Sequence, residues 1–203
     1  MCKDCAREWV RQSSAPFWWP DWAGKTVVIA ATGPSQDWAE VEKAKGKAEV
    51  IAINNAWASV PWASALYACD KKWWNCRDAG YGVDALAQFA GLKITQSEVD
   101  GVHKIIYQIE WGGTSALHAM FVAEAFGAKR ILLTGVDCKN PAQHSHGKHP
   151  LPLAQSTDLA VASWLSSFTA NAPLFRDRGV EVINCTIDTA VDAFPRAMIG
   201  DVI

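Results

Sequence analysis

Three histidines in one loop are the side chains best suited to chemistry in this chain. His144, His146 and His149 lie between Asp137 and Gln155, in a stretch that contains glycine and prolines and has no apolar periodicity, which predicts a long loop or lid over a ligand. An imidazole titrates near neutral pH, so we expect these histidines, with Asp137 nearby, to act as a general base or as partners of a phosphate. Two alternatives stay open. The histidines bind a metal ion together with Asp137, although H-x-H-x-x-H falls short of the known zinc patterns, or they are solvated loop residues.

Two glycine-containing turns are candidates for binding a phosphate or a sugar. Each opens a helix-forming segment, where backbone amides attract an anion and glycine permits a close approach of the backbone. Each can also be an ordinary turn and helix cap. The candidate residues in these turns are Thr32, Gly33, Pro34, Ser35, Gly113, Thr114 and Ser115.

Further polar and aromatic side chains come directly after two other apolar segments. Asn54 and Asn55 offer amide donors and acceptors for a ribose or a base edge, and an Asx turn is the structural alternative. Trp57 follows them, and Asp70 stands after the next apolar segment. Because an indole ring can stack on a base, we expect these four residues to contribute to a nucleotide site.

The elements that must position these residues are short apolar strands that alternate with helices. Strands are predicted at residues 26–31, 49–54, 65–69, 104–109, 130–134 and 180–184. Helices are predicted at 114–126, which is apolar almost all round, and at 157–178, where we expect Pro173 to bend or end the helix. This order predicts an α/β, Rossmann-like, doubly wound and mostly parallel sheet with helices on both faces and a histidine-containing lid loop. Ligands of such sheets bind beyond the carboxyl ends of the strands, where the candidate residues converge.

The composition fits a folded domain and argues against several classes of function. With 203 residues, 50% of them hydrophobic and 20% charged, the chain can bury a core of its own. No apolar run approaches the roughly 20 residues that cross a bilayer, and the first residues do not read as a secretory signal, so we expect a cytoplasmic protein without membrane contact. A net charge of −2 with scattered basic residues gives no strong signal for nucleic-acid binding. Cys2 and Cys5 have the spacing of half a metal site, which is weak evidence for zinc, and we expect free thiols.

Eleven tryptophans is a large number for a chain of this length. Four of them precede the first predicted strand: Trp9, Trp18, Trp19 and Trp22. We expect residues 1–24 to form a Trp-rich extension that packs on a single nucleotide-binding domain, residues 25–203, with the indoles as anchors. A stacking platform for a base or a self-association surface is the alternative, and exposed tryptophans would favour a homo-oligomer.

The order of these motifs resembles the bacterial sialyltransferases of the Campylobacter type, from about residue 27 to residue 195. The shared pattern is a Gly-Pro-Ser turn after the first strand, a strand followed by Asn, a Thr-Ser pair that opens a helix, a strand that ends in TGVD, a histidine-containing loop and a last strand VEVINC. The resemblance implies a Rossmann-like fold and metal-independent transfer of sialic acid from CMP-sialic acid, with a loop histidine as the base. By position it implies that Gly33, Ser35, Asn55, Thr114 and Ser115 contact the donor and that His149 or His146 is the base.

Several positions differ from that family. Its first loop reads Gly-Asn-Gly-Pro-Ser, whereas this chain has Ala31 and Thr32 in place of the first Gly and the Asn. Asp70 stands where an Asn is expected, and residues 137–155 lack the tyrosines that hold the leaving phosphate in that family. The same turn and strand ends also resemble the archaeal pterin diphosphokinase-like group, and the compact layout is similar to small proteins of tailed phages and prophages.

We therefore predict a protein that binds a nucleotide or a nucleotide-sugar of the CMP or UDP type and requires no cofactor. As an enzyme it would be a metal-independent glycosyltransferase with a loop histidine as the base. Two other functions are compatible with the sequence. One is a non-catalytic protein that sequesters a host nucleotide signal, with Trp57, Trp73 and Trp74 stacked on the base, and the other is a pterin diphosphokinase-like phosphotransferase. In a phage setting, the cytoplasm is that of the host.

Overall fold

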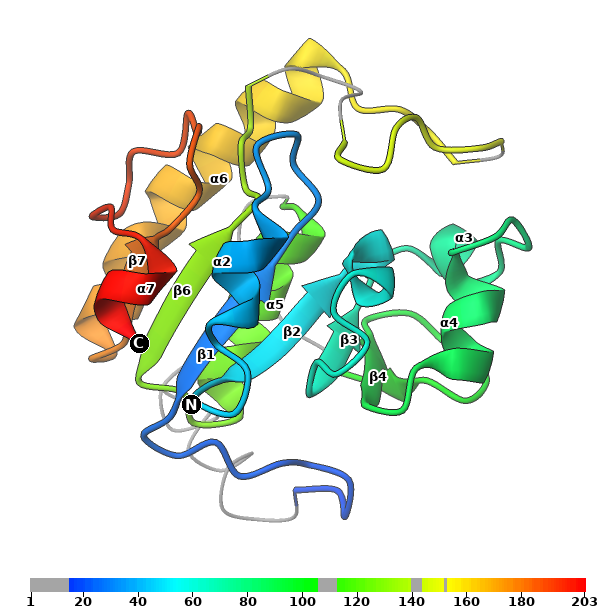
Figure 1. Cartoon of the computed structure of the whole chain (residues 1–203), viewed down its shortest axis with the longest axis horizontal. Helices are drawn as coiled ribbons and strands as arrows, with labels where there is room; N and C mark the ends of the chain where they lie inside the picture. The colour runs from blue at the N-terminus through cyan, green and yellow to red at the C-terminus, as the bar shows by residue number, and fades with distance from the viewer. Residues whose placement is uncertain (1–14, 106–112, 140–143, 152) are drawn as a thin grey trace, which may run out of the picture.

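A seven-stranded parallel sheet forms the centre of the molecule (Figure 1). The computed structural model describes residues 15–105, 113–139, 144–151 and 153–203. The strand order is β5-β4-β3-β2-β1-β6-β7, and every neighbouring pair is parallel. The strands are β1 Thr26–Ala30, β2 Glu49–Ile53, β3 Ala65–Tyr67, β4 Leu92–Thr95, β5 His103–Lys104, β6 Arg130–Thr134 and β7 Glu181–Asn184. The predicted Rossmann-like α/β fold is confirmed.

The central strands are buried on both faces because their side chains alternate between two cores. In β1, Val27 and Ile29 belong to one core, whereas Val28 and Ala30 belong to the other. Helices α5 and α6 cover the first face, and the remaining helices cover the second (Figure 1). The helices are α2 Trp38–Glu42, the 3₁₀ helix η1 Asn54–Ala58, α3 Lys71–Trp74, α4 Gly82–Gln88, α5 Ser115–Ala125, α6 Asp158–Asp177 and α7 Ile199–Val202.

Helix α5 follows the sequence pattern closely. Thr114 caps its start, since the hydroxyl accepts a hydrogen bond from the Leu117 amide at 3.2 Å, and ten of its 11 residues are buried. Gly127 ends it with a φ of 101°, a left-handed conformation that glycine adopts without strain. The predicted helix at 114–126, buried on most sides, is confirmed.

Three elements differ from the prediction. Strand β4 was not predicted, because Lys93 interrupts its short apolar pattern. The strand expected at 104–109 contributes only Lys104, to β5, and residues 106–109 lie outside the described part of the chain. Helix α6 continues past Pro173 to Asp177. Both Pro173 and Thr169, whose carbonyl loses its helical partner, are exposed, so water can satisfy that carbonyl.

Residues 15–24 pack on the end of α5. The Trp22 amide donates to the Phe126 carbonyl at 2.8 Å, and the two rings meet edge to face with their centroids 5.0 Å apart. Trp18 stacks on His103 at 4.3 Å. In these residues the indoles are packing anchors; Trp9, Cys2 and Cys5 lie outside the described residues. None of the helices in the described ranges is long and apolar enough to cross a membrane.

Candidate functional site

The strand order reverses between β1 and β6, and this point defines the candidate site. From β1 the chain moves outward through β2 to β5, and it then returns to the other side of β1 as β6 and β7. In open parallel sheets, ligands bind beyond the carboxyl ends of the strands at such a point. The loop after β1 holds Thr32 to Ser35, and the loop after β6 holds Gly135 to Lys139.

Gly33 allows these two loops to touch. Its amide donates to the Gly135 carbonyl at 2.8 Å, which extends the β1–β6 pairing beyond the strands. A Cβ on Gly33 would lie 2.7 Å from Asp137 Cγ and closer still to Asp137 Oδ2 and the Gly135 carbonyl oxygen. Real Cβ atoms do not approach other heavy atoms this closely. Glycine is therefore needed here, because any side chain at this position would clash with the loop after β6. This clash explains why the turn contains Gly33.

Asp137 occupies the position that was expected to receive a phosphate. Its Oδ1 accepts a hydrogen bond from the Ser35 amide at 2.8 Å, and the Gln36 amide is bonded to the Gly33 carbonyl at 3.1 Å. Helix α2 is a short helix that starts only at Trp38, where Asp37 caps it. The expectation that the amides of the first turn cradle a phosphate is thus corrected, because a carboxylate of the protein already uses the Ser35 amide. Pro34, between them, is exposed.

The second oxygen of Asp137 lacks a partner. Asp137 is only 6% exposed, and its Oδ2 is buried without a hydrogen bond to any described residue. Burial raises the pKa of this carboxyl above its ordinary value of 3.8, and the nearby Asp188 acts in the same direction. An unsatisfied buried carboxylate oxygen is costly, and a donor from a ligand would remove that cost.

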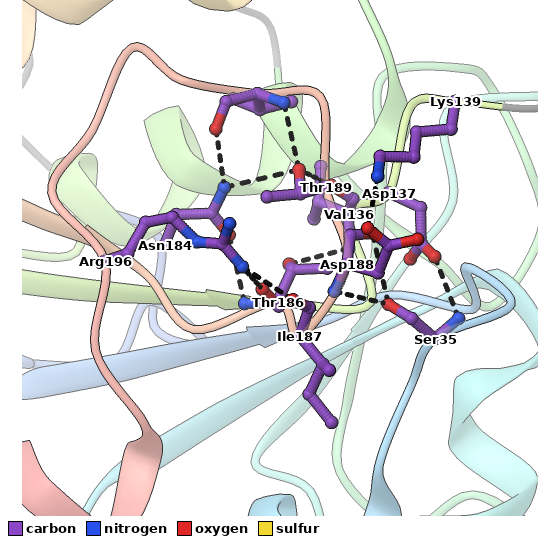
Figure 2. Close-up of polar contacts among 11 residues, drawn as sticks. Ser35, Val136, Asp137, Lys139, Asn184, Thr186, Ile187, Asp188, Thr189 and Arg196 are labelled. Atoms are coloured by element: carbon purple, nitrogen blue, oxygen red, sulfur yellow. Dashed lines mark hydrogen bonds and ion pairs between the residues drawn. The ribbon is translucent and has the colours of Figure 1, made fainter.

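The segment after β7 supports the first loop from the side (Figure 2). Ser35 Oγ accepts a hydrogen bond from the Asp188 amide at 3.2 Å. The Asp188 side chain forms an ion pair with Lys139. The loops after β1, β6 and β7 therefore meet at Ser35.

Buried hydrogen bonds hold this segment in place (Figure 2). Asn184, at the end of β7, is fully buried; its Nδ2 donates to the Val191 carbonyl at 2.9 Å. The Val136 amide donates to Thr186 Oγ1 at 3.0 Å, and Thr189 Oγ1 donates back to the Val136 carbonyl at 2.7 Å. Because these bonds satisfy both backbone groups of Val136, they fix the residue directly before Asp137.

The histidine loop lies over this edge of the sheet, as the sequence predicted for a lid (Figure 1, yellow). The Ser145 amide donates to the Thr32 carbonyl at 2.8 Å, which joins the lid to the first loop. The three imidazoles form one cluster: the centroid distances are 5.1 Å for His144–His146, 4.5 Å for His144–His149 and 5.2 Å for His146–His149. Among the described residues, no group of three His, Cys, Asp or Glu side chains is placed to hold a metal ion.

His149 is the member of the cluster best placed to accept a proton. Its Nδ1 is 3.1 Å from the hydroxyl of Tyr81, and its Nε2 makes no hydrogen bond within the described part of the chain. Burial and the neighbouring imidazoles lower the pKa of His144 and His146 to about 4. Burial also lowers the pKa of His149, and here the charge of Asp70 opposes the shift. The charge of Asp70 therefore favours a protonated His149 during a reaction.

The polar side-chain groups of Asn55 and Trp57 are hydrogen-bonded to other residues of the protein. Asn55 Nδ2 donates to the Gly80 carbonyl at 2.8 Å, its Oδ1 accepts from Trp73 Nε1 at 2.9 Å, and Trp57 Nε1 donates to the same Gly80 carbonyl at 3.1 Å. Trp57, Trp73 and Trp74 are 6%, 3% and 0% exposed. Their ring faces are covered by protein, which corrects the expectation that these tryptophans stack on a base. Through these contacts they support the loop that contains Gly80 and Tyr81.

The other predicted residues lie along the edge toward β3. Ser115 Oγ accepts a hydrogen bond from the Cys69 amide at 3.3 Å, so the start of α5 meets the loop after β3. Gly113 lies beside the ring of buried His118, whose Nδ1 is 3.1 Å from the Tyr67 hydroxyl. Burial lowers the pKa of His118 to about 4. Asn54 has a φ of 50° and begins η1, and Asp70 is exposed before α3.

Comparisons with known proteins agree with this architecture. No protein-family model matches the sequence, and a comparison with curated proteins gives no match. Among solved structures, the MAf glycosyltransferase from Magnetospirillum magneticum AMB-1 is similar with a TM-score of 0.62 and 14% identity, over 90% of this chain and 35% of that one. The sialyltransferase CstII from Campylobacter jejuni, in complex with CMP-3FNeuAc, is similar with a TM-score of 0.56 and 14% identity, over 86% of both chains. Both neighbours share the fold.

The extent of the match differs between the two neighbours. This chain spans about a third of the Magnetospirillum protein and most of the Campylobacter protein. At 14% identity the similarity shows the fold alone. Neither neighbour is a phage protein, so the phage setting stays a prediction.

Three residues of the site were not selected from the sequence. Asp188 follows the last strand, so the strand-end rule that selected the other loops applies to it as well. Lys139 lies two residues beyond Asp137 in the same loop. Tyr81 stands in a glycine-rich loop far from any predicted strand end, and no signal in the sequence connects it to His149. The contact between them exists only in the folded chain.

A cavity of about 530 Å³ lies at the opposite edge of the sheet from these residues. That cavity lies at the amino ends of β1, β2 and β3 and is lined by residues that include Lys25, Lys45, Lys47 and Trp62. None of the predicted site residues lines it.

Proposed function

We propose that the protein is a glycosyltransferase that binds a CMP- or UDP-type nucleotide-sugar at the carboxyl edge of the sheet, beside the β1 and β6 loops. The donor lies beneath the histidine lid, and the acceptor is a hydroxyl group that reaches His149. The known neighbours support this assignment through their fold, and one of them was solved with a CMP-sugar analogue.

The observation that carries the proposal is the unpartnered Oδ2 of Asp137. It is buried at the point where the strand order reverses, next to Gly33 and beneath the loop on which Ser145 docks the lid. A carboxylate oxygen in this position selects a ligand that offers a hydroxyl or an N–H donor, and a ribose or sugar hydroxyl fits that requirement. A bare phosphate fits this requirement poorly, because it carries the same sign of charge as the carboxylate.

The reaction uses His149 as a general base. The acceptor oxygen attacks the anomeric carbon, and a new carbon–oxygen bond forms. The bond from that carbon to the donor phosphate breaks, and the nucleotide leaves with the electron pair. His149 takes the proton of the acceptor hydroxyl on its Nε2, while the Tyr81 hydroxyl accepts the N–H of Nδ1 and fixes the tautomer. None of these steps needs a metal ion.

Turnover of a panel of nucleotide-sugars tests the proposal. The protein is incubated with CMP- and UDP-sugars with and without a mixture of simple glycosides as acceptors, and mass spectrometry follows both ligand and products. We expect release of CMP or UDP together with a glycosylated acceptor. His149→Ala is expected to lower the rate by about 100-fold or more, which is the usual contribution of a general base. His118→Ala is the control, since that imidazole lies in the interior beside Tyr67.

Two results would contradict the proposal. Recovery of an intact nucleotide from the protein after incubation, without product, would support sequestration instead. Transfer of a phosphate or diphosphate group, rather than of a sugar, would support the phosphotransferase alternative. If His149→Ala and His146→Ala both transfer sugar at the wild-type rate, the assignment of the base is wrong.

A further inference from the structure

A lysine stands beside the Ser35 loop in a contact that a ligand can replace. Lys139 forms its ion pair with Asp188, and the Asp188 amide is bonded to Ser35 Oγ at 3.2 Å (Figure 2). The side chains of Lys139 and Asp188 are 39% and 65% exposed. The ammonium group is therefore accessible to solvent at the mouth of the site.

The charges around Ser35 determine what this lysine can do. Asp137 and Asp188 both bring a carboxylate to the Ser35 loop, and the Ser35 amide is already bonded to Asp137. A nucleotide that donates a hydroxyl to Asp137 must place its phosphate near the same residues, where two negative side chains repel it. Lys139 contacts Asp188 directly, whereas the nearby Arg196 is bonded to the carbonyls of Thr186 and Ile187, so the flexible side chain of Lys139 is the one that can turn from Asp188 to a phosphate.

We propose that Lys139 binds the phosphate of the nucleotide and that Asp188 holds Lys139 when no nucleotide is bound. This inference rests on the proposed function and adds a residue that recognises the leaving group. An exposed ion pair contributes less than about a tenfold change in an equilibrium, so little is lost when Lys139 leaves Asp188. A phosphate that carries up to two charges competes well with one carboxylate, and the contact neutralises the charge that grows on the nucleotide as it departs.

The experiment compares nucleotides with their nucleosides. Calorimetry measures the affinities of CMP and cytidine, and of UDP and uridine, for the wild type, Lys139→Ala and Asp188→Asn. We expect Lys139→Ala to weaken CMP or UDP by about tenfold and to leave the nucleoside unchanged. Asp188→Asn keeps the backbone bond to Ser35 and frees the lysine, so the nucleotide should bind about threefold more tightly. The effect of Lys139 should shrink as salt is raised, because the group is exposed.

The chain offers a matched control pair. Lys104 and Glu98 form an ion pair at 2.5 Å, with side chains 40% and 79% exposed, at the far edge of the sheet. Lys104→Ala and Glu98→Gln change the net charge in the same way and should leave all four affinities unchanged. Thermal unfolding of each variant shows that it is folded.

The outcomes separate this inference from the function on which it rests. If CMP or UDP binds the wild type and Lys139→Ala binds it as well as Lys104→Ala does, the role of Lys139 is refuted and the nucleotide site stands. If Lys139→Ala weakens the nucleoside as much as the nucleotide, the residue does not recognise phosphate, and the inference is again refuted. If neither nucleotide nor nucleotide-sugar binds the wild type, the proposed function fails and the inference fails with it.

Discussion

Replacement of Gly33 by alanine tests whether the loops after β1 and β6 meet as described. The new Cβ would lie 2.7 Å from Asp137 Cγ and still closer to Asp137 Oδ2 and the Gly135 carbonyl. The Gly135 oxygen is part of the backbone and cannot rotate away. One of the two loops must therefore shift, and the hydrogen bond from the Gly33 amide to Gly135, 2.8 Å long, is weakened.

The magnitude follows from these two losses. Forcing extra volume into a packed backbone contact costs roughly 1–3 kcal/mol, and the weakened hydrogen bond adds about 1 kcal/mol. We expect Gly33→Ala to lower the free energy of unfolding by about 2–4 kcal/mol and Tm by about 5–15 °C for a chain of this size. Urea unfolding and a thermal scan measure both. Gly200→Ala is the matched control: its Cβ meets only the flexible Lys43 side chain, and alanine favours the helix α7.

A double-mutant cycle locates the clash. Asp137→Ala removes two of the three atoms that the new Cβ meets, although the Gly135 carbonyl stays. Gly33→Ala should therefore cost less in the Asp137→Ala background than in the wild type, with a coupling of about 0.5–3 kcal/mol. Additive effects, or a Gly33→Ala variant as stable as Gly200→Ala, would refute the reasoning that places Asp137 against Gly33.

Three further predictions concern the carboxylate, the lid and the amino-terminal segment. Asp137→Asn removes a buried charge: burial raises the pKa of Asp137, so the folded wild type binds the proton more tightly than the unfolded chain, and its stability falls as pH rises from about 3.8 through the folded pKa. The stability of Asp137→Asn relative to the wild type should therefore grow across that window in urea titrations, and a pH-independent difference would contradict the burial argument. Tyr81→Phe removes the hydroxyl next to His149 Nδ1 and should lower kcat of sugar transfer about three- to tenfold with KM unchanged; a change in KM alone would place Tyr81 at the donor instead. Trp22→Ala, at a side chain 3% exposed, should cost about 3–5 kcal/mol of stability, whereas Phe17→Ala, fully exposed, should cost nothing, and equal effects would show that residues 15–24 are not packed as described.

The sequence predicts the central strands and helix α5 because these elements depend on local patterns of residues. The apolar segments of β1, β2 and β6 and the helix α5 between Thr114 and Gly127 carry periodicity, caps and glycine that are readable residue by residue. Strand β4 has only four residues, one of them Lys93, and this pattern is too short to be separated from a loop. The predicted convergence of loops at the carboxyl edge follows from the parallel sheet and includes Ser35, Asp137 and the histidine lid.

The roles of individual site residues were harder to predict because they depend on contacts between distant segments. Trp73 and Asn55 look like ligand groups at strand ends, yet they bond to each other. Asp137 was expected to assist a histidine, and it instead takes the amide of Ser35, over 100 residues earlier in the chain. No local pattern reports such pairings. The sequence locates the edge at which the site lies, and the folded chain decides which side chains remain available there.

The contact between Ser35 and Asp188 determines when, during folding, the loop after β1 reaches its final conformation. The two residues are 153 positions apart, and the parallel strands that join them must be assembled before they can meet. Contacts between such distant residues form late, because closing the long loop carries an entropic cost. A nascent chain that has already made β1 to β6 still lacks the segment that supports its first loop. The loop after β1 should therefore reach its final conformation only after β7 and residues 185–189 have folded onto the sheet.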